Sequence, residues 1–295
     1  MKIIQGDELK EVVLAFRHRQ GLFRHRKLMT GEPGSPGNFS LELVRTTDDF
    51  FSPRHKHNFD QIRYQIEGEF DFDRNGKMKP GIIGYFPEGT PYGPQTSSVS
   101  SMTLVLQFGG ASGSGYMTQE QTEASAVELL KTGVFEKGVY RRNEGVEGKR
   151  NVDGYQALWE NVNKRPMKYP AQRYHDPIMM SPDHFDWVPI GGIPGVCEKL
   201  MGVFTERGCE ARFFRLAPSA SIPARGRKLY FILTGDGRVG GRDQSKDRGP
   251  AYRHYTTVFC ERGEQAVFEA EAPTEILVLG LPMLESTAHY SVAAE

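Results

Sequence analysis

The sequence has few cysteines, no excess of charge of either sign and no long apolar run. Its three cysteines, Cys197, Cys209 and Cys260, are too few and too scattered for a disulfide framework or a zinc knuckle. Acidic and basic residues number 37 each among 295, so no net field draws the chain to nucleic acid or to a membrane surface. No apolar run approaches the roughly 20 residues of a membrane-spanning helix. We therefore expect neither nucleic-acid nor membrane partners.

The first residues, MKIIQGDELKEVVLAF, carry acidic side chains where a secretory signal needs an uninterrupted apolar stretch. Together with the scarcity of cysteine, this predicts a reduced, cytoplasmic protein. The chain is long enough to form two ordinary domains, each with its own core.

Short strand-like segments dominate both ends of the chain. In the first part they are separated by Gly, Pro, Asn and Asp, which predicts an all-β barrel or sandwich. A similar β pattern returns from about residue 185. The predicted strands cover residues 38–48, 61–75, 82–87 and 101–109 in the first part, and 199–206, 209–218, 227–235, 254–263, 265–273 and 274–282 in the second.

The middle of the chain has a different pattern. GGASGSG, residues 109–115, predicts a flexible linker. The following TQEQTEASAVELLKTG predicts a helix with Thr118 as N-cap and Gly133 as its stop, and GYQALWENVNK predicts a second, shorter helix. The proline-rich residues 165–184 predict an extended linker.

The most informative segment is RHKHNFDQIRYQIEG, residues 54–68, which places His55 and His57 one residue apart. Residues two apart on a strand point to the same face, so both imidazoles can be presented to one metal ion. The segment resembles the first motif of the cupins, G-x5-H-x-H-x3-E-x6-G. Gln61 stands in the place of the glutamate, Gly68 closes the motif at the right spacing, and the opening glycine is absent.

A second cupin motif, G-x5-P-x-G-x2-H-x3-N, is matched in part further along the chain. Gly81, Pro87 and Gly89 stand at its first three fixed positions. Tyr92 takes the place of the histidine, and Thr96 takes that of the asparagine. The resemblance implies that Tyr92 is the fourth candidate ligand, beside His55, His57 and Gln61.

The resemblance implies an all-β protein of two cupin barrels, each a double-stranded β-helix or jelly roll, joined by a short helical region. We expect an N-terminal barrel with the metal site over residues 1–110, a linker over 111–184, and a degenerate C-terminal barrel over 185–295. In the second barrel, counting back from a glycine corner at Gly235 places the ligand positions on residues that cannot hold a divalent metal well. These are Ile222, Ala224, Lys228 and, near the fourth position, Ala266.

Two orientations of the run that begins at Gln61 are compatible with its alternation. If Gln61 faces inward, as its family position implies, Arg63 and Gln65 share that face. The alternative is that the apolar residues between them form the core face and the polar ones meet water; those apolar residues are Ile62, Tyr64 and Ile66. The motif spacing favours the first orientation.

Two neutral imidazoles and a neutral carboxamide would leave the charge of a divalent ion uncompensated. Such a site favours an anionic ligand, and Arg63 adds a fixed positive group. Tyr92 is a candidate metal ligand, a candidate catalytic acid or base, or a hydrogen-bond donor to substrate. Gln65 and Gln107 join Arg63 as candidate substrate-binding residues.

Three functions are consistent with these residues. The first is a dioxygenase-type oxidoreductase that uses one divalent metal, Fe(II) by resemblance to many cupins, and acts on a small anionic organic substrate. The second is a redox-neutral isomerase, cyclase or lyase with Zn, Ni or Mn as a Lewis acid. The third is a metal-free ligand-binding or sensor barrel. We expect a monomer or a homodimer.

Two further patterns are set aside. GDGRVGG, from Gly235, contains G-x-G-x-x-G after a strand, but no helix follows it, so it predicts a hairpin rather than a dinucleotide site. FRHR occurs at residues 16–19 and again at 23–26. We interpret the pair as solvated strands, with an anion-steering rim of the barrel as the alternative.

Overall fold

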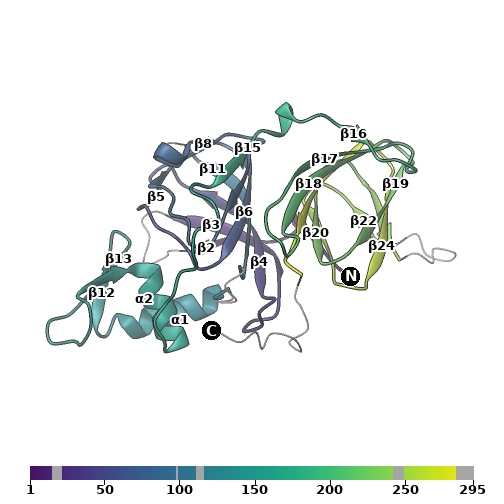
Figure 1. The fold of residues 1–295 in the computed structure, drawn as a ribbon. Coiled ribbons are helices and arrows are strands. Elements are labelled where there is room, and N and C mark those ends of the chain that lie inside the picture. Colours follow the sequence, from purple (N-terminus) through teal and green to yellow (C-terminus); the bar gives the residue numbers. More distant parts are fainter. Residues whose placement is uncertain (15–21, 98, 111–115, 242–248, 284–295) are drawn as a thin grey trace, which may run out of the picture. The chain divides into compact units, whose positions relative to one another are not determined.

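The computed structural model describes residues 1–14, 22–97, 99–110, 116–241 and 249–283. Its contacts divide the chain into an N-terminal unit, Gln5–Asp186, and a C-terminal unit, Met1–Ile4 with Trp187–Glu295 (Figure 1). Strands make up most of the regular structure in both units, so the expected all-β class is confirmed. None of the described helices is long and apolar enough to span a membrane. Residues 111–115, within the predicted flexible linker, lie outside the described part.

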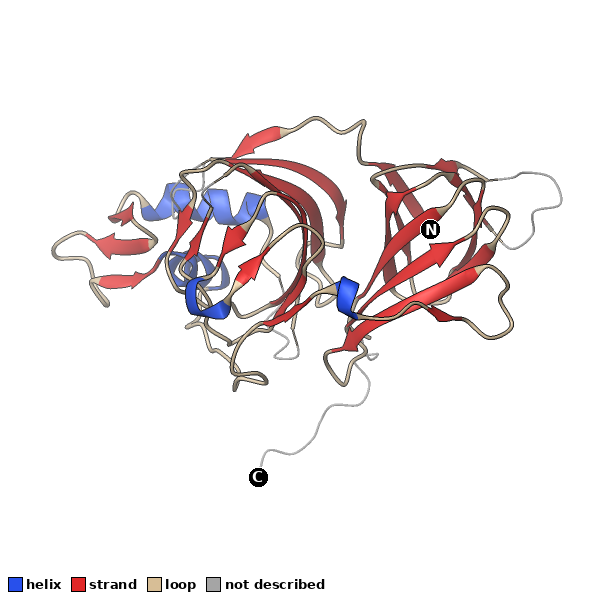
Figure 2. Ribbon diagram, turned by 90° about the horizontal axis from the view of Figure 1, so that it is seen from above, coloured by secondary structure: helices blue, strands red, loops and turns tan. Residues whose placement is uncertain are grey.

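The N-terminal unit contains two antiparallel sheets. The larger has the order β15-β9-β6-β11-β4-β3-β2 and the smaller β5-β10-β7-β8, and the long strands of the larger sheet are curved (Figure 2). The strands are β2 (Val12–Leu14), β3 (Phe23–Thr30), β4 (Phe39–Thr46), β5 (Phe51–Ser52), β6 (Asp60–Glu67), β7 (Phe70–Asp71), β8 (Lys77–Met78), β9 (Ile83–Phe86), β10 (Gln95–Thr96), β11 (Ser101–Phe108) and β15 (Ile178–Met180). A 3-10 turn, Asp73–Asn75, precedes β8.

A glycine corner ends the central strand β6. Gly68 has φ +65°, and a Cβ atom there would lie 2.4 Å from the Ser100 carbonyl oxygen. Only glycine fits both the left-handed backbone and this close approach. The C-terminal unit has an equivalent corner at Gly235, with φ +87° and the Pro273 carbonyl oxygen 2.4 Å from the position of a Cβ. The two barrels therefore share this local construction.

The region between the two β patterns is more than a linker. Helix α1 (Gln119–Leu129) begins at the predicted N-cap, Thr118, which forms a capping box with Gln121, and the predicted second helix is α2 (Gly154–Asn163). Gly133 is not the helix stop: α1 ends at Leu129, with Leu130 as its C-cap, and Gly133 begins a strand. That strand belongs to a sheet that the sequence did not predict, formed by β12 (Gly133–Glu136), β13 (Val139–Arg142) and β14 (Asn151–Asp153).

The proline-rich segment after α2 is extended, as predicted, but part of it is β-structure. Strand β15 pairs with β9 and forms the edge of the large N-terminal sheet. A 3-10 turn, Pro182–His184, then leads to β16 (Val188–Pro189) of the C-terminal unit.

The C-terminal unit also has two antiparallel sheets, of orders β1-β23-β20-β25-β18-β17-β16 and β19-β24-β21-β22. The first strand of the chain, β1 (Lys2–Gln5), belongs to this unit's larger sheet. GDGRVGG forms strand β21 (Gly237–Gly240), which pairs with β22 and β24, so the hairpin prediction is confirmed. The remaining strands are β17 (Val196–Val203), β18 (Glu210–Leu216), β19 (Ser221–Arg225), β20 (Lys228–Thr234), β22 (Ala251–Tyr252), β23 (Thr256–Cys260), β24 (Gln265–Ala270) and β25 (Thr274–Gly280).

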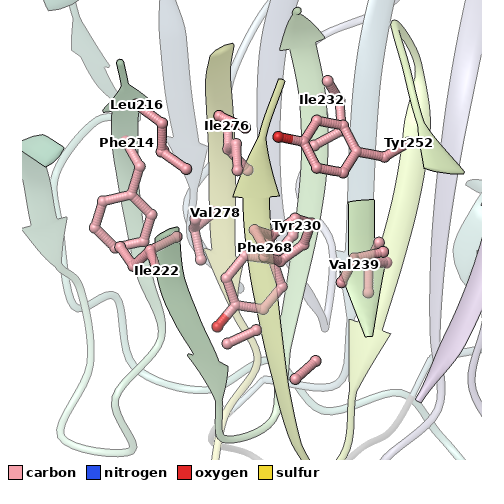
Figure 3. Packing of buried hydrophobic residues seen from close by; sticks show 14 of the residues in the cluster. Phe214, Leu216, Ile222, Tyr230, Ile232, Val239, Tyr252, Phe268, Ile276 and Val278 are labelled. Carbon is pink, nitrogen blue, oxygen red and sulfur yellow. The ribbon is translucent and has the colours of Figure 1, made fainter. Parts of the chain in front are cut away.

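Apolar side chains fill the interior of the C-terminal barrel. Figure 3 shows Phe214, Ile222, Tyr230 and Phe268 converging between the two sheets. At the degenerate ligand positions, Ile222, Ala224 and Ala266 are 3%, 0% and 1% exposed and belong to this core. The remaining position, Lys228, forms an ion pair with Glu210.

We expect enlarged side chains in this core to cost stability. Ala224 and Ala266 are buried, direct cross-strand partners, so Ala266→Leu adds three carbons within the packed core. Its free energy of unfolding should fall by about 1–3 kcal/mol in denaturant titrations. Ala251→Leu, at an exposed position of β22, is the control. Loss of activity with unchanged stability in Ala266→Leu would show that this barrel holds a site of its own.

A buried acid begins strand β6. Asp60 is 2% exposed and accepts a hydrogen bond from the Glu88 backbone N–H at 2.7 Å. Burial raises the pKa of Asp60 from 3.8 to about 7, with the nearby Glu88 carboxylate adding to the rise. The folded protein therefore binds a proton that the unfolded chain has released between these two pH values.

This difference predicts that the contribution of Asp60 to stability falls as pH rises. Below about pH 4 Asp60 is protonated in both states, and from there to pH 7 its contribution to the free energy of unfolding should drop by about 1.4 kcal/mol per pH unit. Asp60→Asn keeps an oxygen for the Glu88 N–H and removes the charge, so it should flatten this slope and stabilise the protein at pH 8 by on the order of 4 kcal/mol. Urea titrations from pH 4 to 8 test this, with exposed Asp183→Asn as control. An unchanged slope would contradict it.

Candidate metal and anion site

The N-terminal barrel encloses a cavity of about 170 Å³. One part of its wall is polar and includes His55, His57, Arg63 and Gln95. Another part is apolar and mostly aromatic, with side chains from β3, β7 and the segments that flank β5 and β6: Phe23, Phe50, Phe59 and Phe70. Residues near and within the two helices also line the cavity, among them Met117, Thr122 and Tyr155. The helical region is therefore part of the site's wall.

His55 and His57 lie in an extended segment just before β6, outside the regular strands. The backbones of His55 and Tyr92 pair as an isolated antiparallel bridge, with N···O distances of 3.1 and 2.9 Å. The Gly89 N–H donates to the His57 carbonyl at 2.7 Å. These bonds keep the backbone extended, so the two side chains still share a face.

The two imidazoles converge. Their Nε2 atoms are 3.1 Å apart, and both side chains are buried, at 8% and 7% exposure for His55 and His57. His55 Nδ1 lies 2.6 Å from the Pro53 carbonyl oxygen, which can only accept a hydrogen bond. The proton of neutral His55 is therefore on Nδ1, and its Nε2 lone pair faces His57.

Gln61, Arg63 and Tyr92 form one buried hydrogen-bonded network. The Arg63 guanidinium donates to Gln61 Oε1 at 3.0 and 2.7 Å and to the Tyr92 hydroxyl at 3.0 Å. Gln61 Nε2 also donates to the Tyr92 hydroxyl, at 3.0 Å. The Arg63 donors fix the orientation of the Gln61 amide, because only its oxygen can accept them. On the other side, Arg63 donates to Gln95 Oε1 at 3.1 Å.

Arg63 is a buried cation whose partners are all neutral. No carboxylate forms an ion pair with it in the described part of the chain, and its polar contacts are to two amides and a phenol. Its guanidinium also lies 4.6 Å from the centroid of the Phe86 ring and 5.6 Å from that of Phe72. Burial lowers the pKa of Arg63, although nearby Tyr92 opposes the shift. A buried charge without a counterion is costly, and an anion in the cavity would relieve that cost.

The remaining predicted residues have different positions. Gln65 is buried but does not line the cavity: it accepts from Thr103 and donates to the Glu67 carbonyl. Gln107 does line the cavity, where its Oε1 accepts from the Tyr116 hydroxyl at 2.8 Å. Gln61 and Tyr92 are not among the lining residues; they lie behind the wall and hold Arg63.

Several polar residues of the cavity were missed from the sequence, among them Gln95, Glu42 and His25. Gln95 occupies a variable position of the second cupin motif, between Tyr92 and Thr96, and Glu42 is part of a strand without a motif. His25 was assigned to a solvated strand, and that interpretation is wrong for this residue, which is 5% exposed and lines the cavity. The first FRHR copy, residues 16–19, lies outside the described part. Alternation along β3 was the signal that could have separated His25 from its exposed neighbour Arg24.

The donor set fits a metal ion in part. Two imidazole nitrogens at 3.1 Å separation, each about 2.1 Å from one ion, would subtend an angle of about 95° at it, as neighbouring ligands do. Among the described residues, no group of three or more His, Cys, Asp or Glu side chains is placed to hold a metal. The Gln61 and Tyr92 oxygens already accept hydrogen bonds from Arg63. The histidine pair is therefore the part of the set that fits, with further positions open to ligands from solution.

No protein-family model matches the sequence, and no curated protein matches it. Solved structures share its fold. A "putative dioxygenase" from Nostoc punctiforme aligns over all of this chain and 87% of its own length, at 12% identity and a TM-score of 0.62. Oxalate decarboxylase from Bacillus subtilis, a protein with Mn(II) centres, aligns over 95% of this chain and 77% of its own at 13% identity and a TM-score of 0.56. The chain thus has the two-barrel cupin fold.

Gln61→Glu tests whether Arg63 is held ready for an anion. A carboxylate at this position would form an ion pair with Arg63 and neutralise it, so an anionic ligand loses its attraction. At an effective dielectric of 20, two unit charges 4 Å apart interact by about 4 kcal/mol, and we expect at least a tenfold loss of affinity after partial screening. Calorimetric titration with oxalate as probe measures this, with exposed Gln172→Glu as control for the added charge. Equal affinity in both variants would contradict the expectation.

Proposed function

We propose that the protein is a metal-dependent enzyme that acts on a small anionic organic substrate in the cavity of the N-terminal barrel. The observation that carries the proposal is the placement, on the wall of one cavity, of a converging histidine pair and a buried arginine that no described carboxylate compensates. The filled C-terminal barrel would then have a structural role.

Each residue has a separate task in this proposal. His55 and His57 hold one divalent ion through their Nε2 atoms, and the Pro53 carbonyl fixes the tautomer of His55. Arg63 binds the substrate's negative group, and the amides of Gln61 and Gln95 hold the guanidinium in place. The aromatic wall excludes water from the body of the substrate. When bound, the metal supplies Lewis-acid polarisation of a substrate oxygen or, as a redox metal, electron transfer with O2.

Tyr92 is a positioning residue in this arrangement, because its hydroxyl accepts from both Gln61 and Arg63 and it does not line the cavity. Fe(II) with O2 is our first assignment, and a redox-neutral reaction with Mn, Zn or Ni is the alternative. The fold neighbours carry names of both types, a dioxygenase and a decarboxylase. Oxygen consumption with the metal-loaded protein separates the two.

A metal-free ligand-binding barrel is the second candidate function. It is favoured by the network around Arg63, in which every neutral partner is satisfied without a metal. In that case the two histidines form a hydrogen bond to each other, and Arg63 alone attracts the anion.

Metal analysis of the purified protein decides between these functions. We expect close to one divalent ion per chain, and loss of that ion in the double variant His55→Ala with His57→Ala. The control is the double variant His175→Ala with His184→Ala, which removes two exposed imidazoles. Unfolding temperatures check that the variants fold.

Metal retained in the His55/His57 variant would contradict the assignment of these ligands. A protein that takes up no metal from Fe(II), Mn(II) or Zn(II) solutions, yet binds oxalate with an affinity reduced by Gln61→Glu, would establish the metal-free candidate instead.

A further inference from the structure

A second polar group faces the same cavity from the sheet strands beyond Arg63. His25 on β3 and Glu42 on β4 both line the cavity, and His25 Nδ1 lies 2.7 Å from Glu42 Oε2. The second oxygen of Glu42 accepts from the Ser40 hydroxyl at 2.6 Å. The side chains of His25 and Glu42 are only 6% and 16% exposed. This pair is not part of either cupin motif.

The sheet register fixes where this pair lies relative to Arg63. Arg63 on β6 is the cross-strand partner of Val105 on β11, and Val105 is in turn the partner of Glu42. Cross-strand partners point to the same face, so the cation and the carboxylate stand in one row with an apolar residue between them. Two strand spacings separate their backbones by about 10 Å. The wall therefore has a positive end and an end with a carboxylate.

No neighbouring lysine or arginine of the described chain forms an ion pair with the Glu42 carboxylate. Lys27 is the cross-strand partner of Glu42 on β3, but its ammonium donates to Glu120 at 2.8 Å. Among the described residues, the only ion-pair partner of Glu42 is His25. Tyr116 also lines this end, and burial, followed by the Glu42 charge, raises the pKa of its phenol, so it stays a neutral hydrogen-bonding group.

The Glu42 carboxylate also determines how His25 can act. A carboxylate accepts hydrogen bonds, so the proton of neutral His25 is on Nδ1 and its Nε2 is an acceptor. Within the described part of the chain, no hydrogen bond engages that Nε2. The two acceptors, imidazole and carboxylate, match a hydroxyl or an ammonium group of a ligand.

We propose that His25 and Glu42 form a second, specificity-determining subsite, and that the substrate is a bifunctional molecule with an anionic group at one end and a hydroxyl or amino group at the other. The anionic end binds Arg63, the donor end binds the His25–Glu42 pair, and the short body between them lies against Val105 and the phenylalanine wall. This inference rests on the proposed anion-binding function of Arg63.

Matched carboxylates test the subsite. The probes are ω-hydroxy and ω-amino carboxylates with chains of three to six carbons, each compared by calorimetry with the unsubstituted acid of the same length. In the unmodified protein we expect at least one substituted acid to bind about tenfold more tightly than its unsubstituted match. The double variant His25→Phe with Glu42→Met removes both polar partners without leaving a buried charge unpaired. It should lose that preference and keep its affinity for the unsubstituted acid.

A second variant serves if the double variant does not fold. Glu42→Gln keeps the shape of the side chain and removes its charge. The preference for ω-amino carboxylates over the unsubstituted acids of the same length should therefore disappear. Glu144→Gln, at an exposed position, is the control.

The outcomes separate the two proposals. If Gln61→Glu weakens binding of every acid but no substituted acid is preferred, or the preference survives removal of the His25–Glu42 pair, the second subsite is refuted and the anion site stands. If no acid binds, or Gln61→Glu changes none of the affinities, the anion site itself fails and the second subsite fails with it.

Discussion

The burial of Arg63 with no negative partner among the described residues is the constraint on which the rest of the N-terminal barrel depends. A guanidinium in the interior must have its donors satisfied, and here two amide oxygens, a phenol oxygen and two aromatic faces do so. Gln61 is explained by the same constraint. A glutamate at its position would neutralise Arg63, so the change from the cupin pattern keeps the positive charge available. The barrel thus retains an unbalanced charge facing its own cavity.

The two barrels have the same fold but differ in how their interiors are filled. Both have antiparallel double sheets and a glycine corner, at Gly68 and at Gly235. In the C-terminal barrel Ile222, Ala224 and Ala266 face a core filled by Phe214, Phe268 and their neighbours. The inner face of the N-terminal barrel instead carries polar side chains such as His55, His57 and Arg63, which line a cavity. The same fold therefore has a packed interior in the C-terminal barrel and a cavity in the N-terminal barrel.

The sequence predicted the local structure better than the site. Period-two alternation and glycine corners were sufficient for most long strands, and the capping residue Thr118 located α1. The histidine spacing and the parity of Gln61 and Arg63 placed them together because β geometry determines which residues share a face. The role of the Gln61 oxygen could not be predicted, since it depends on the rotamer of Arg63.

The sequence could not predict residues that reach the cavity from unrelated segments. Tyr155 belongs to a helix that was interpreted as a connection, and Gln95 to a two-residue strand too short to show a pattern. His25 stands in a basic segment whose composition resembles a solvated surface, while its register with Val44 turns it inward. Pairing between distant segments determines which of these residues reach the cavity, and the local sequence pattern carries no information about that pairing.

The position of β1 has a consequence for the order in which the protein can form during synthesis. This strand precedes the N-terminal unit in the sequence, yet it pairs with β23 in a sheet whose other strands all follow that unit. The N-terminal unit can fold as soon as residue 186 leaves the ribosome, because all its strands are then present. Strand β1 can form its native pairing only after β23 (Thr256–Cys260) has been made. A fusion partner attached before β1 would thus affect the pairing of β1 with β23, and so the folding of the C-terminal unit.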